Sequence, residues 1–427
     1  MAKRLLYKPV LPLEVPDDDD ESYEIVNLLN NPTLIPIFQI KKNPNLSGKS
    51  QRILTSLGNH IEEIIGYIFE DHPTPLGTRC YLAIQSSQEK LMKQMIEKGL
   101  LQVPAIKLMS QENPPLLAIC RLAGVTYATI MCRPAAISQS CGYIFQLLDY
   151  INLPSIFDFF FQLVGSNEDL AEAQKWLVSV KFESVIIQQI KSTPIDDPKL
   201  KYLFKLCAVT RFSPIIYPTF TTSQVVSILC GKVTTLYEDD RWEALFSLYN
   251  DNTRVYMQSL FPMIIQKLKE PFLVCNRFHI AILGILTKII VFDEGLHPFI
   301  ATSDLSPIVM HILNTFPNHS ILLSMMEKFL VASFKIPEIA AQIAPAVIPF
   351  CMQTAQERKN ITISAFSMKI LNFAASRCFA DQLLKNLLKY IPGFRQFLKA
   401  DLAEYNKLEK NSYGGESEGM EPKRITV

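Results

Sequence analysis

Residues 270–334 read EPFLVCNRFHIAILGILTKIIVFDEGLHPFIATSDLSPIVMHILNTFPNHSILLSMMEKFLVASF, and this stretch decides the fold class. From Arg277 to Phe292 the residues are apolar almost all round, which predicts a helix that its neighbours bury on several sides. A membrane-spanning helix needs about 20 such residues, so this shorter run predicts no membrane span. The stretch therefore indicates a helix inside a packed helical array.

Two further helices are expected in the same stretch. Ser306 followed by Pro307 is typical of an N-cap and a first helical residue. Asn318, which follows a proline, is expected to cap the next helix. Three packed helices joined by short turns are the unit of an α-solenoid, so the stretch predicts that kind of architecture.

Similar segments occur along most of the chain. Helix pairs recur at roughly 40-residue spacing, the range of degenerate HEAT or armadillo units. We therefore predict an all-α fold, an elongated α-solenoid of degenerate HEAT/armadillo-like helical repeats over residues 22–410. The other predicted helices include 23–30, 60–69, 103–109, 115–132, 154–164, 182–190, 200–209, 340–351, 362–374, 381–390 and 395–408, with a loop over 211–222.

The two ends of the chain have a different composition. Residues 1–21 are expected to form an extended lead-in that closes with the acidic run Asp17 to Glu21. Residues 411–427 are polar and contain glycine, so we predict a disordered tail there. The solenoid is expected between these two segments.

Composition and charge exclude several classes of function. The net charge is +1, so there is no global field to attract nucleic acid or anionic lipid. Aromatic residues sit at core spacing and are not interleaved with Lys and Arg, which argues against a nucleic-acid partner. Low Gly content (15) beside frequent Pro (27) fits helices that are punctuated at their ends.

The nine cysteines are scattered and none forms a CxxC pair. This usage is typical of reduced thiols in a cytosolic or nuclear protein. The N-terminal residues lack the continuous apolar core of a signal peptide. We therefore expect a soluble protein of the cytoplasm, with the nucleus as a second compartment.

The search for catalytic patterns finds two partial matches. Ser417 lies in a GxSxG sequence, but that motif works only on a strained strand-to-helix turn, and here it falls in the polar tail. Gly58-Asn59-His60 matches part of a metallophosphatase motif, but the next residue is Ile61 rather than Glu and the partner motifs are absent. We predict no catalytic residue, no metal and no cofactor, and keep a serine hydrolase using Ser417 as the enzyme alternative.

Three segments, taken in succession, resemble the SAPS-domain family, the regulatory subunits of protein phosphatase 6-type serine/threonine phosphatases. The first is YINLPSIFDFFFQLV at 150–164, followed by QKWL at 174–177. The second is EPFLVCNRFHI at 270–280, in which Val274 stands where the family has Gly. The third is FPNHSIL at 316–322. The sequence ends before the long C-terminal extension of typical members.

The resemblance implies a non-catalytic regulatory or scaffold subunit. Its partner would be a type 2A-like serine/threonine phosphatase catalytic subunit, which it would direct to substrates, with room for an ankyrin-repeat third subunit. The main alternative is an armadillo-like interaction scaffold or transport adaptor with an unrelated partner. Regularly spaced Asn and Trp residues along a groove would favour that alternative.

Arg277 and His279 are candidate partner contacts, because they are polar groups inside an apolar stretch. A buried charge needs a compensating partner. The structural interpretation is therefore that Arg277 pairs within the chain, with a carboxylate such as Glu270 or Asp293, and fixes helix packing. The functional interpretation is that both residues touch a protein partner.

Asn318 and Asp158 are the other two candidate contacts. For Asn318 the structural alternative is the N-cap described above. Asp158 stands amid Ile and Phe residues, and its structural alternative is an internal ion pair. Trp176 is interpreted as a core residue.

Overall fold

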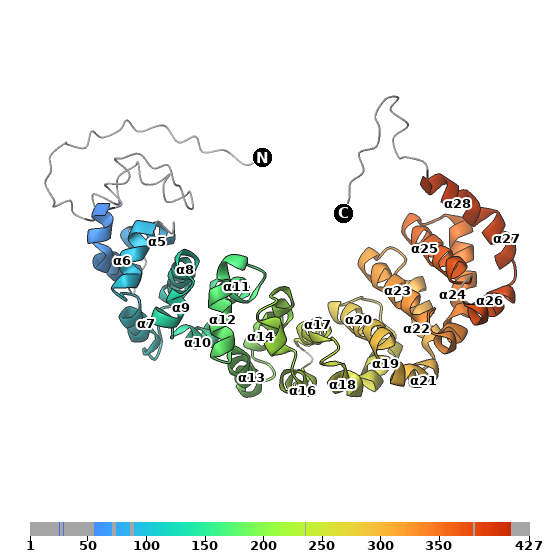
Figure 1. Ribbon diagram of the computed structural model, residues 1–427, viewed down its shortest axis with the longest axis horizontal. Helices are drawn as coiled ribbons and strands as arrows, with labels where there is room; N and C mark the ends of the chain where they lie inside the picture. Colours follow the sequence, from blue (N-terminus) through green and yellow to red (C-terminus); the bar gives the residue numbers. More distant parts are fainter. Residues whose placement is uncertain are drawn as a thin grey trace, which may run out of the picture. The chain divides into compact units, whose positions relative to one another are not determined.

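The computed structural model describes Ile25, Leu29 and residues 55–70, 74–85, 89–234, 236–378 and 381–410. Every regular element among these residues is a helix, which confirms the all-α prediction (Figure 1). The lead-in at 1–21, most of the 23–30 helix and the tail at 411–427 with Ser417 lie outside the described residues.

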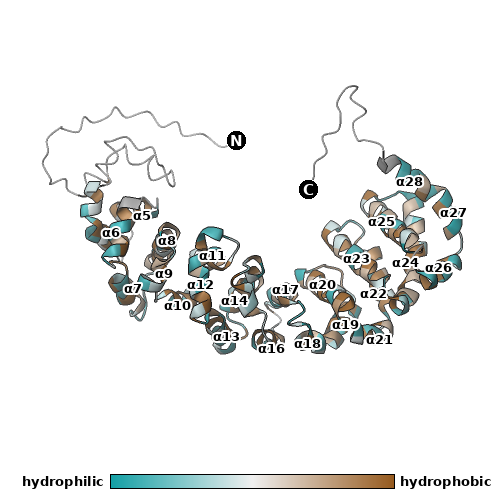
Figure 2. Ribbon diagram, viewed as in Figure 1, coloured by the Kyte–Doolittle hydropathy of each residue, from teal (hydrophilic) through white to brown (hydrophobic). Residues whose placement is uncertain are grey.

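The chain divides into two compact units, Met1–Tyr237 and Glu238–Val427. The sequence predicts one continuous array over 22–410 and gives no sign of this division. Within both units the helices carry apolar and polar segments side by side (Figure 2), as expected when one face packs and the other meets water. Each unit is described separately below as unit 1 and unit 2.

Unit 1 holds a row of helices in which α5 packs on α8, α8 on α11, and α11 on α14. A buried arginine joins the start of this row, because Arg121 on α8 donates to the Ile68 carbonyl (3.2 Å) and to the Thr78 hydroxyl (3.0 Å). The helices of the unit are α4 (Ile61–Ile68), α5 (Pro75–Gln85), α6 (Glu89–Glu97), α7 (Gln102–Met109), α8 (Leu116–Cys132), α9 (Ala136–Ser140), α10 (Ile144–Leu147), α11 (Pro154–Val164), α12 (Ala171–Ser179), α13 (Phe182–Ser192), α14 (Lys199–Val209), α15 (Tyr217–Phe220) and α16 (Ser223–Gly231).

Unit 2 has two layers of helices. In the first layer α17 packs on α20, α20 on α23, and α23 on α25; in the second, α19, α22, α24 and α26 follow one another. The helices are α17 (Glu238–Leu248), α18 (Arg254–Met257), α19 (Phe261–Lys269), α20 (Arg277–Phe292), α21 (His297–Ala301), α22 (Leu305–Thr315), α23 (Ser320–Ser333), α24 (Pro337–Glu357), α25 (Ile361–Arg377), α26 (Gln382–Lys389), α27 (Phe394–Lys399) and α28 (Asp401–Lys410).

The predicted helix bounds hold best where an apolar run is closed by polar residues. The predicted helix 277–292 coincides with α20, and 154–164 coincides with α11. The prediction for Ser306 is wrong, because α22 starts at Leu305 after Asp304, and the Ser306 hydroxyl donates to the Gln342 carbonyl (2.7 Å). The predicted loop at 211–222 contains the short helix α15, and the predicted helix 395–408 is broken at Ala400.

Candidate functional site

The first layer of unit 2 brings four helix N-termini to one edge. At the starts of α17 and α20, Arg277 contacts Asp240 (2.9 Å). The start of α23 meets the loop before α20, because the rings of Phe272 and Phe316 stack with centroids 5.3 Å apart. The starts of α23 and α25 are joined by the side-chain amides of Asn318 and Asn360, 2.6 Å apart. We call residues 238–243, 272–279, 316–322 and 360–363 the N-terminal edge.

Three of the four predicted contact residues lie on this edge: Arg277, His279 and Asn318. They come from two segments that are about 40 residues apart in the sequence, so the fold brings together what the chain separates. Asp158 does not join them, because it belongs to α11 of unit 1.

Arg277 has partners other than the predicted ones. Its guanidinium contacts Asp240 (2.9 Å) and Glu243 (3.2 Å) of α17, and 53% of its side chain is exposed. The predicted pairing with Asp293 is wrong because the two residues lie at opposite ends of α20, about 24 Å apart along its axis. The predicted pairing with Glu270 is wrong as well, since Arg277 turns to α17. A half-exposed guanidinium held by two carboxylates keeps surface that a partner can contact.

His279 is a buried part of the helix start. Its Nδ1 accepts a hydrogen bond from the Asn276 backbone N–H (3.0 Å), which forms a capping box with Asn276. Its ring lies against Phe272 and Phe278, with both centroid distances 3.9 Å. Burial lowers the pKa of this imidazole, so the ring is neutral at neutral pH. His279 therefore fixes the loop and presents little surface to a partner.

Asn318 does not have its predicted role as an N-cap. Since α23 begins at Ser320, the capping position falls on His319, whose Nδ1 accepts from the Leu322 N–H (3.2 Å). Asn318 instead accepts a hydrogen bond from Asn360 (2.6 Å), which itself caps α25. Asn318 is exposed and connects two neighbouring helix starts on the edge.

Four aliphatic side chains project from the same edge into solvent. Leu273 is 86% exposed and Val274 69%, both in the loop before α20. Ile321 at the start of α23 is 65% exposed, and Ile361 at the start of α25 is 86% exposed. Sequence reasoning missed all four, although Leu273 and Val274 precede the helix and Ile321 and Ile361 fall outside the buried stripes of α23 and α25. Aliphatic surface of this kind gives about 25 cal/mol for each Å² that a partner covers.

A cluster of aromatic rings holds the exposed loop in place. His311 on α22 contacts the Phe272 carbonyl through Nε2 (3.0 Å), and its ring meets that of Phe272 edge-on at 5.1 Å. Phe272 also stacks on Phe316, as described above. The loop that carries Leu273 and Val274 is thus anchored on both sides, which makes it a fixed surface for binding.

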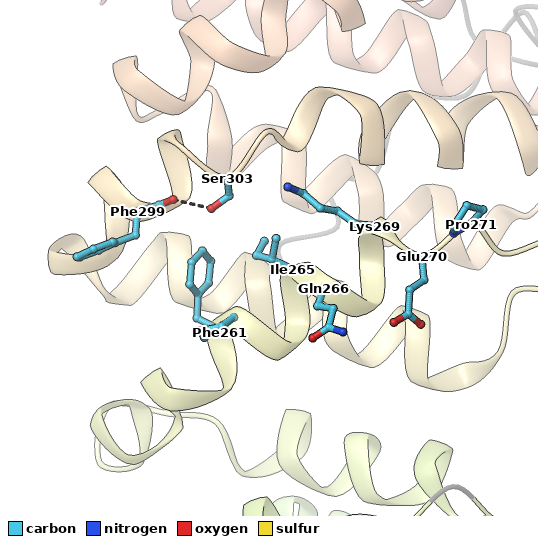
Figure 3. Close-up of a pocket in the computed structure, with 9 residues that line it drawn as sticks. Phe261, Ile265, Gln266, Lys269, Glu270, Pro271, Phe299 and Ser303 are labelled. Carbon is cyan, nitrogen blue, oxygen red and sulfur yellow. Dashed lines mark hydrogen bonds between the residues drawn. The ribbon is translucent and has the colours of Figure 1, made fainter.

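A shallow hollow of about 780 Å³ opens beside the base of this loop (Figure 3). Phe299 on its rim is 62% exposed, and its carbonyl accepts from the Ser303 hydroxyl (2.5 Å). Figure 3 shows Lys269 and Glu270 pointing in different directions, so they form no charged pair across the hollow. The lining fits an apolar side chain and consists of Phe261, Pro262, Ile265, Gln266, Lys269, Glu270, Pro271, Phe299 and Ser303.

In unit 1, Asp158 and Trp176 also differ from their predicted settings. Asp158 is exposed on α11 and makes no hydrogen bond or ion pair with another described residue, so its interpretation as an internal partner is wrong. The buried stripe of α11 contains Ile156, Phe159 and Phe160, and Asp158 falls on the opposite side. Trp176 is half-buried and stacks on Phe145 with centroids 5.8 Å apart.

The described residues were compared with the requirements of a metal site and of a membrane-spanning helix. Among residues 55–70, 74–85, 89–234, 236–378 and 381–410, no group of three or more His, Cys, Asp or Glu side chains is placed to hold a metal ion. His60, from the partial metallophosphatase motif, lies beside Glu63 (3.1 Å). No helix in the described part of the chain is long and apolar enough to cross a membrane.

Comparison with known proteins adds no further identification. The chain matches no known family model, and no curated protein matches its sequence.

Proposed function

We propose that this chain is a non-catalytic regulatory subunit that binds a type 2A-like (protein phosphatase 6-type) serine/threonine phosphatase catalytic subunit and directs it to substrates. One observation carries the proposal. The second and third segments that resemble the SAPS-domain family, 270–280 and 316–322, meet on the N-terminal edge through the stacked rings of Phe272 and Phe316. The resemblance of these two segments to a family of partner-binding subunits, together with their contact on this edge, supports the proposal.

The chemistry of the N-terminal edge supports a protein partner. Protein interfaces have an apolar centre and a polar rim, and arginine is enriched among their strongest contacts. Here Leu273, Ile321 and Ile361 supply exposed apolar surface, and Arg277 supplies a half-exposed guanidinium beside it. A surface of this composition is suited to binding a folded protein.

The packing order of the helices supports the architectural part of the proposal. In unit 2 each helix of a layer packs on the next one, and the two layers alternate along the chain. We infer degenerate HEAT/armadillo-like repeats arranged as an α-solenoid, an architecture that exposes long surfaces for partners. A catalytic subunit and an ankyrin-repeat third subunit would share such a surface, in the cytoplasm or nucleus.

The alternative of a transport adaptor has less support. It predicts a groove lined by regularly spaced Asn and Trp residues. Trp242 is fully buried in α17, and Trp176 stacks on Phe145. The two tryptophans of the chain therefore do not line an exposed groove of that kind.

Affinity purification of the tagged full chain, followed by mass spectrometry, tests the proposal. The edge variant replaces Leu273, Ile321 and Ile361 with Ser. The control variant replaces three comparably exposed aliphatic residues of unit 2, Val255 (61%), Val291 (55%) and Leu383 (59%), with Ser. We expect a type 2A-like catalytic subunit to co-purify with the wild type and the control, and about tenfold less with the edge variant.

Three outcomes would count against the proposal. Absence of any type 2A-like catalytic subunit above background would reject the partner. Equal recovery with the edge and control variants would reject the edge as the binding surface. An unrelated protein whose recovery depends on the edge would favour the adaptor alternative. Circular dichroism of each variant checks that helix content is unchanged.

A further inference from the structure

We propose that α11 and α14 of unit 1 form a second binding surface, which takes an acidic polypeptide segment carrying aromatic or aliphatic side chains. This surface belongs to a different unit from the N-terminal edge. The inference goes beyond the proposed phosphatase partner and does not depend on it.

Three aromatic rings from the two helices form the apolar part of the surface. The Phe157 ring lies 5.9 Å from that of Phe161 on the same helix and 5.2 Å from that of Tyr202 on α14. Phe161 is 38% exposed, and Tyr202 is half-buried. The three rings therefore form an apolar strip that is partly exposed to solvent.

Two lysines flank this strip. The Nζ atoms of Lys201 and Lys205 each lie 5.9 Å from the Tyr202 ring centroid. Neither lysine has an ion pair with a carboxylate among the described residues. An ammonium group over an aromatic ring gains only about 0.5–1 kcal/mol at an exposed site, so both charges remain available to an acidic partner.

The sequence of α14 makes the surface consistently basic. Residues 199–211 contain three lysines and Arg211, and no Asp or Glu. At the end of this segment the Arg211 guanidinium lies 4.6 Å from the centroid of Phe212, whose side chain is 52% exposed. A cation beside an exposed ring thus recurs just after the C-terminal end of α14.

Asp197 and Asp158 are acidic residues next to this surface in the sequence, and neither forms an ion pair with Lys201 or Lys205. Asp197 is used at the start of α14, where its Oδ1 accepts from the Lys199 N–H (2.8 Å). Asp158 is exposed on α11 and offers one acceptor beside the rings. A peptide whose acidic residues meet Lys201 and Lys205 could use Asp158 as the acceptor for a backbone N–H.

A polypeptide fits this surface better than a nucleic acid does. Bases stack on open ring faces, whereas these rings are tilted against each other by 55° and 59°, and both lysines lie over the Tyr202 ring. Aliphatic side chains, in contrast, pack readily against ring edges.

Fluorescence anisotropy with the full chain tests the inference. The probe is a labelled peptide that alternates Glu with Leu and Phe; a peptide with Lys in place of Glu and a single-stranded oligothymidylate are the comparison ligands. We expect the acidic peptide alone to bind, with affinity that falls several-fold as NaCl rises from about 50 to about 300 mM.

Charge-reversal variants locate the site. The double variant Lys201→Glu/Lys205→Glu is expected to weaken binding of the acidic peptide about tenfold. The matched control, Lys175→Glu/Lys191→Glu, makes the same charge change at exposed lysines of α12 and α13 and is expected to bind normally. Phe161→Ser is expected to weaken binding about fivefold without a change in the salt dependence.

Several results would overturn the inference. Equal binding of the acidic and basic peptides would show that charge plays no part. An equal loss in the control variant would show only a general charge effect. Oligothymidylate binding that requires Lys201 and Lys205 would assign the surface to nucleic acid instead. All substituted side chains are at least partly exposed, and circular dichroism verifies that the variants fold.

Discussion

The two ends of α20 are both joined to α17, but by different chemistry. At the C-terminal end, Lys288 donates to the carbonyls of Phe246 (2.8 Å) and Tyr249 (2.9 Å). There the Tyr249 hydroxyl also donates to Asp293, which is only 5% exposed. At the N-terminal end the Phe278 N–H donates to Asp239 of α17 (2.7 Å), and the other link is Arg277, more than half of which faces solvent.

The two ends differ in the surface that each leaves to a partner. The last carbonyls of a helix have no partner inside it, and at α17 the Lys288 ammonium satisfies two of them in a half-buried place. The Arg277 pair with Glu243 is exposed and contributes about 0–1 kcal/mol, whereas the Asp240 carboxylate is 5% exposed and needs the Arg277 guanidinium as its compensating charge. We therefore expect both ends to hold the layer together, and only the N-terminal end, with its half-exposed guanidinium, to meet the partner as well.

Asp293→Ala is expected to have the largest effect on stability. It leaves the buried Tyr249 hydroxyl and the Gln258 amide without their acceptor, so the free energy of unfolding should fall by about 2–3 kcal/mol. Urea unfolding of the full chain measures it. In a Trp176→Phe background the fluorescence reports on Trp242 alone, which is fully buried in α17.

Tyr249→Phe is the matched control for that variant. It removes the hydroxyl that loses its acceptor in Asp293→Ala. The double variant should therefore lose less stability than the sum of the losses in the two single variants. Strict additivity would mean that the hydrogen bond contributes nothing at this end, and the expected role of this bond in holding the layer together would fail.

Gly284→Ala probes the middle of the same contact and should have the next largest effect. A Cβ at this position would lie 2.6 Å from a ring carbon of Phe246, so α17 and α20 must move apart or the ring must turn. We expect a loss of about 1–2 kcal/mol in the same urea experiment.

Gly295→Ala is the control for this steric effect, because a Cβ there would have no neighbour within 4 Å. Its stability should stay within about 0.5 kcal/mol of the wild type. If both glycine variants behave alike, the close approach of the two helices is not what fixes their register.

The contact between α17 and α20 also shows why the site was harder to predict than the fold. The bounds of α20 follow from its apolar run alone. The partners of Arg277, however, lie 34 and 37 residues away, on a helix whose register depends on how Gly284 meets Phe246. Local sequence carries no information about that register. The expected pairings of Arg277 with Glu270 and Asp293, the nearest carboxylates in the sequence, are therefore wrong.

The exposed aliphatic residues were missed for a related reason. A hydrophobic pattern shows which residues are able to be buried, but not which of them the packing leaves outside. Ile361 and Ile363 are both apolar, yet only Ile363 reaches the core of unit 2. The N-cap at His319 shows the same limit on a smaller scale, since a shift of one residue transfers the cap from Asn318 to its neighbour.

Acid is expected to reduce the stability of unit 2 through the N-terminal end of α20, by less than the Asp293 and Gly284 substitutions do. This effect depends on His279. Burial lowers the pKa of this ring in the folded state, so at low pH the unfolded chain binds the proton more readily. The stability contribution is complete above the unfolded pKa of about 6.5 and is lost as the pH falls through the lower, folded value.

His279→Gln isolates the pH-dependent contribution of His279 to stability, because Gln at the same position of a capping box accepts the same N–H and does not titrate. Urea unfolding between about pH 7.5 and about pH 5.5 should show a shallower decline in the variant than in the wild type. Identical declines would mean that groups other than His279 cause the acid sensitivity.

Arg277→Gln is expected to have the smallest effect on stability and a large one on binding. Gln can still donate to Asp240 and so keeps this 5%-exposed carboxylate hydrogen-bonded, and the exposed pair with Glu243 should cost about 1 kcal/mol or less when lost. Recovery of the type 2A-like catalytic subunit should nevertheless fall about tenfold. Lys369→Gln, which removes an exposed ion pair with Glu327 in the same helix layer, is the control and should leave recovery unchanged. If Arg277→Gln instead destabilises unit 2 as much as Asp293→Ala does, the lost recovery follows from unfolding and gives no support for Arg277 as a partner contact.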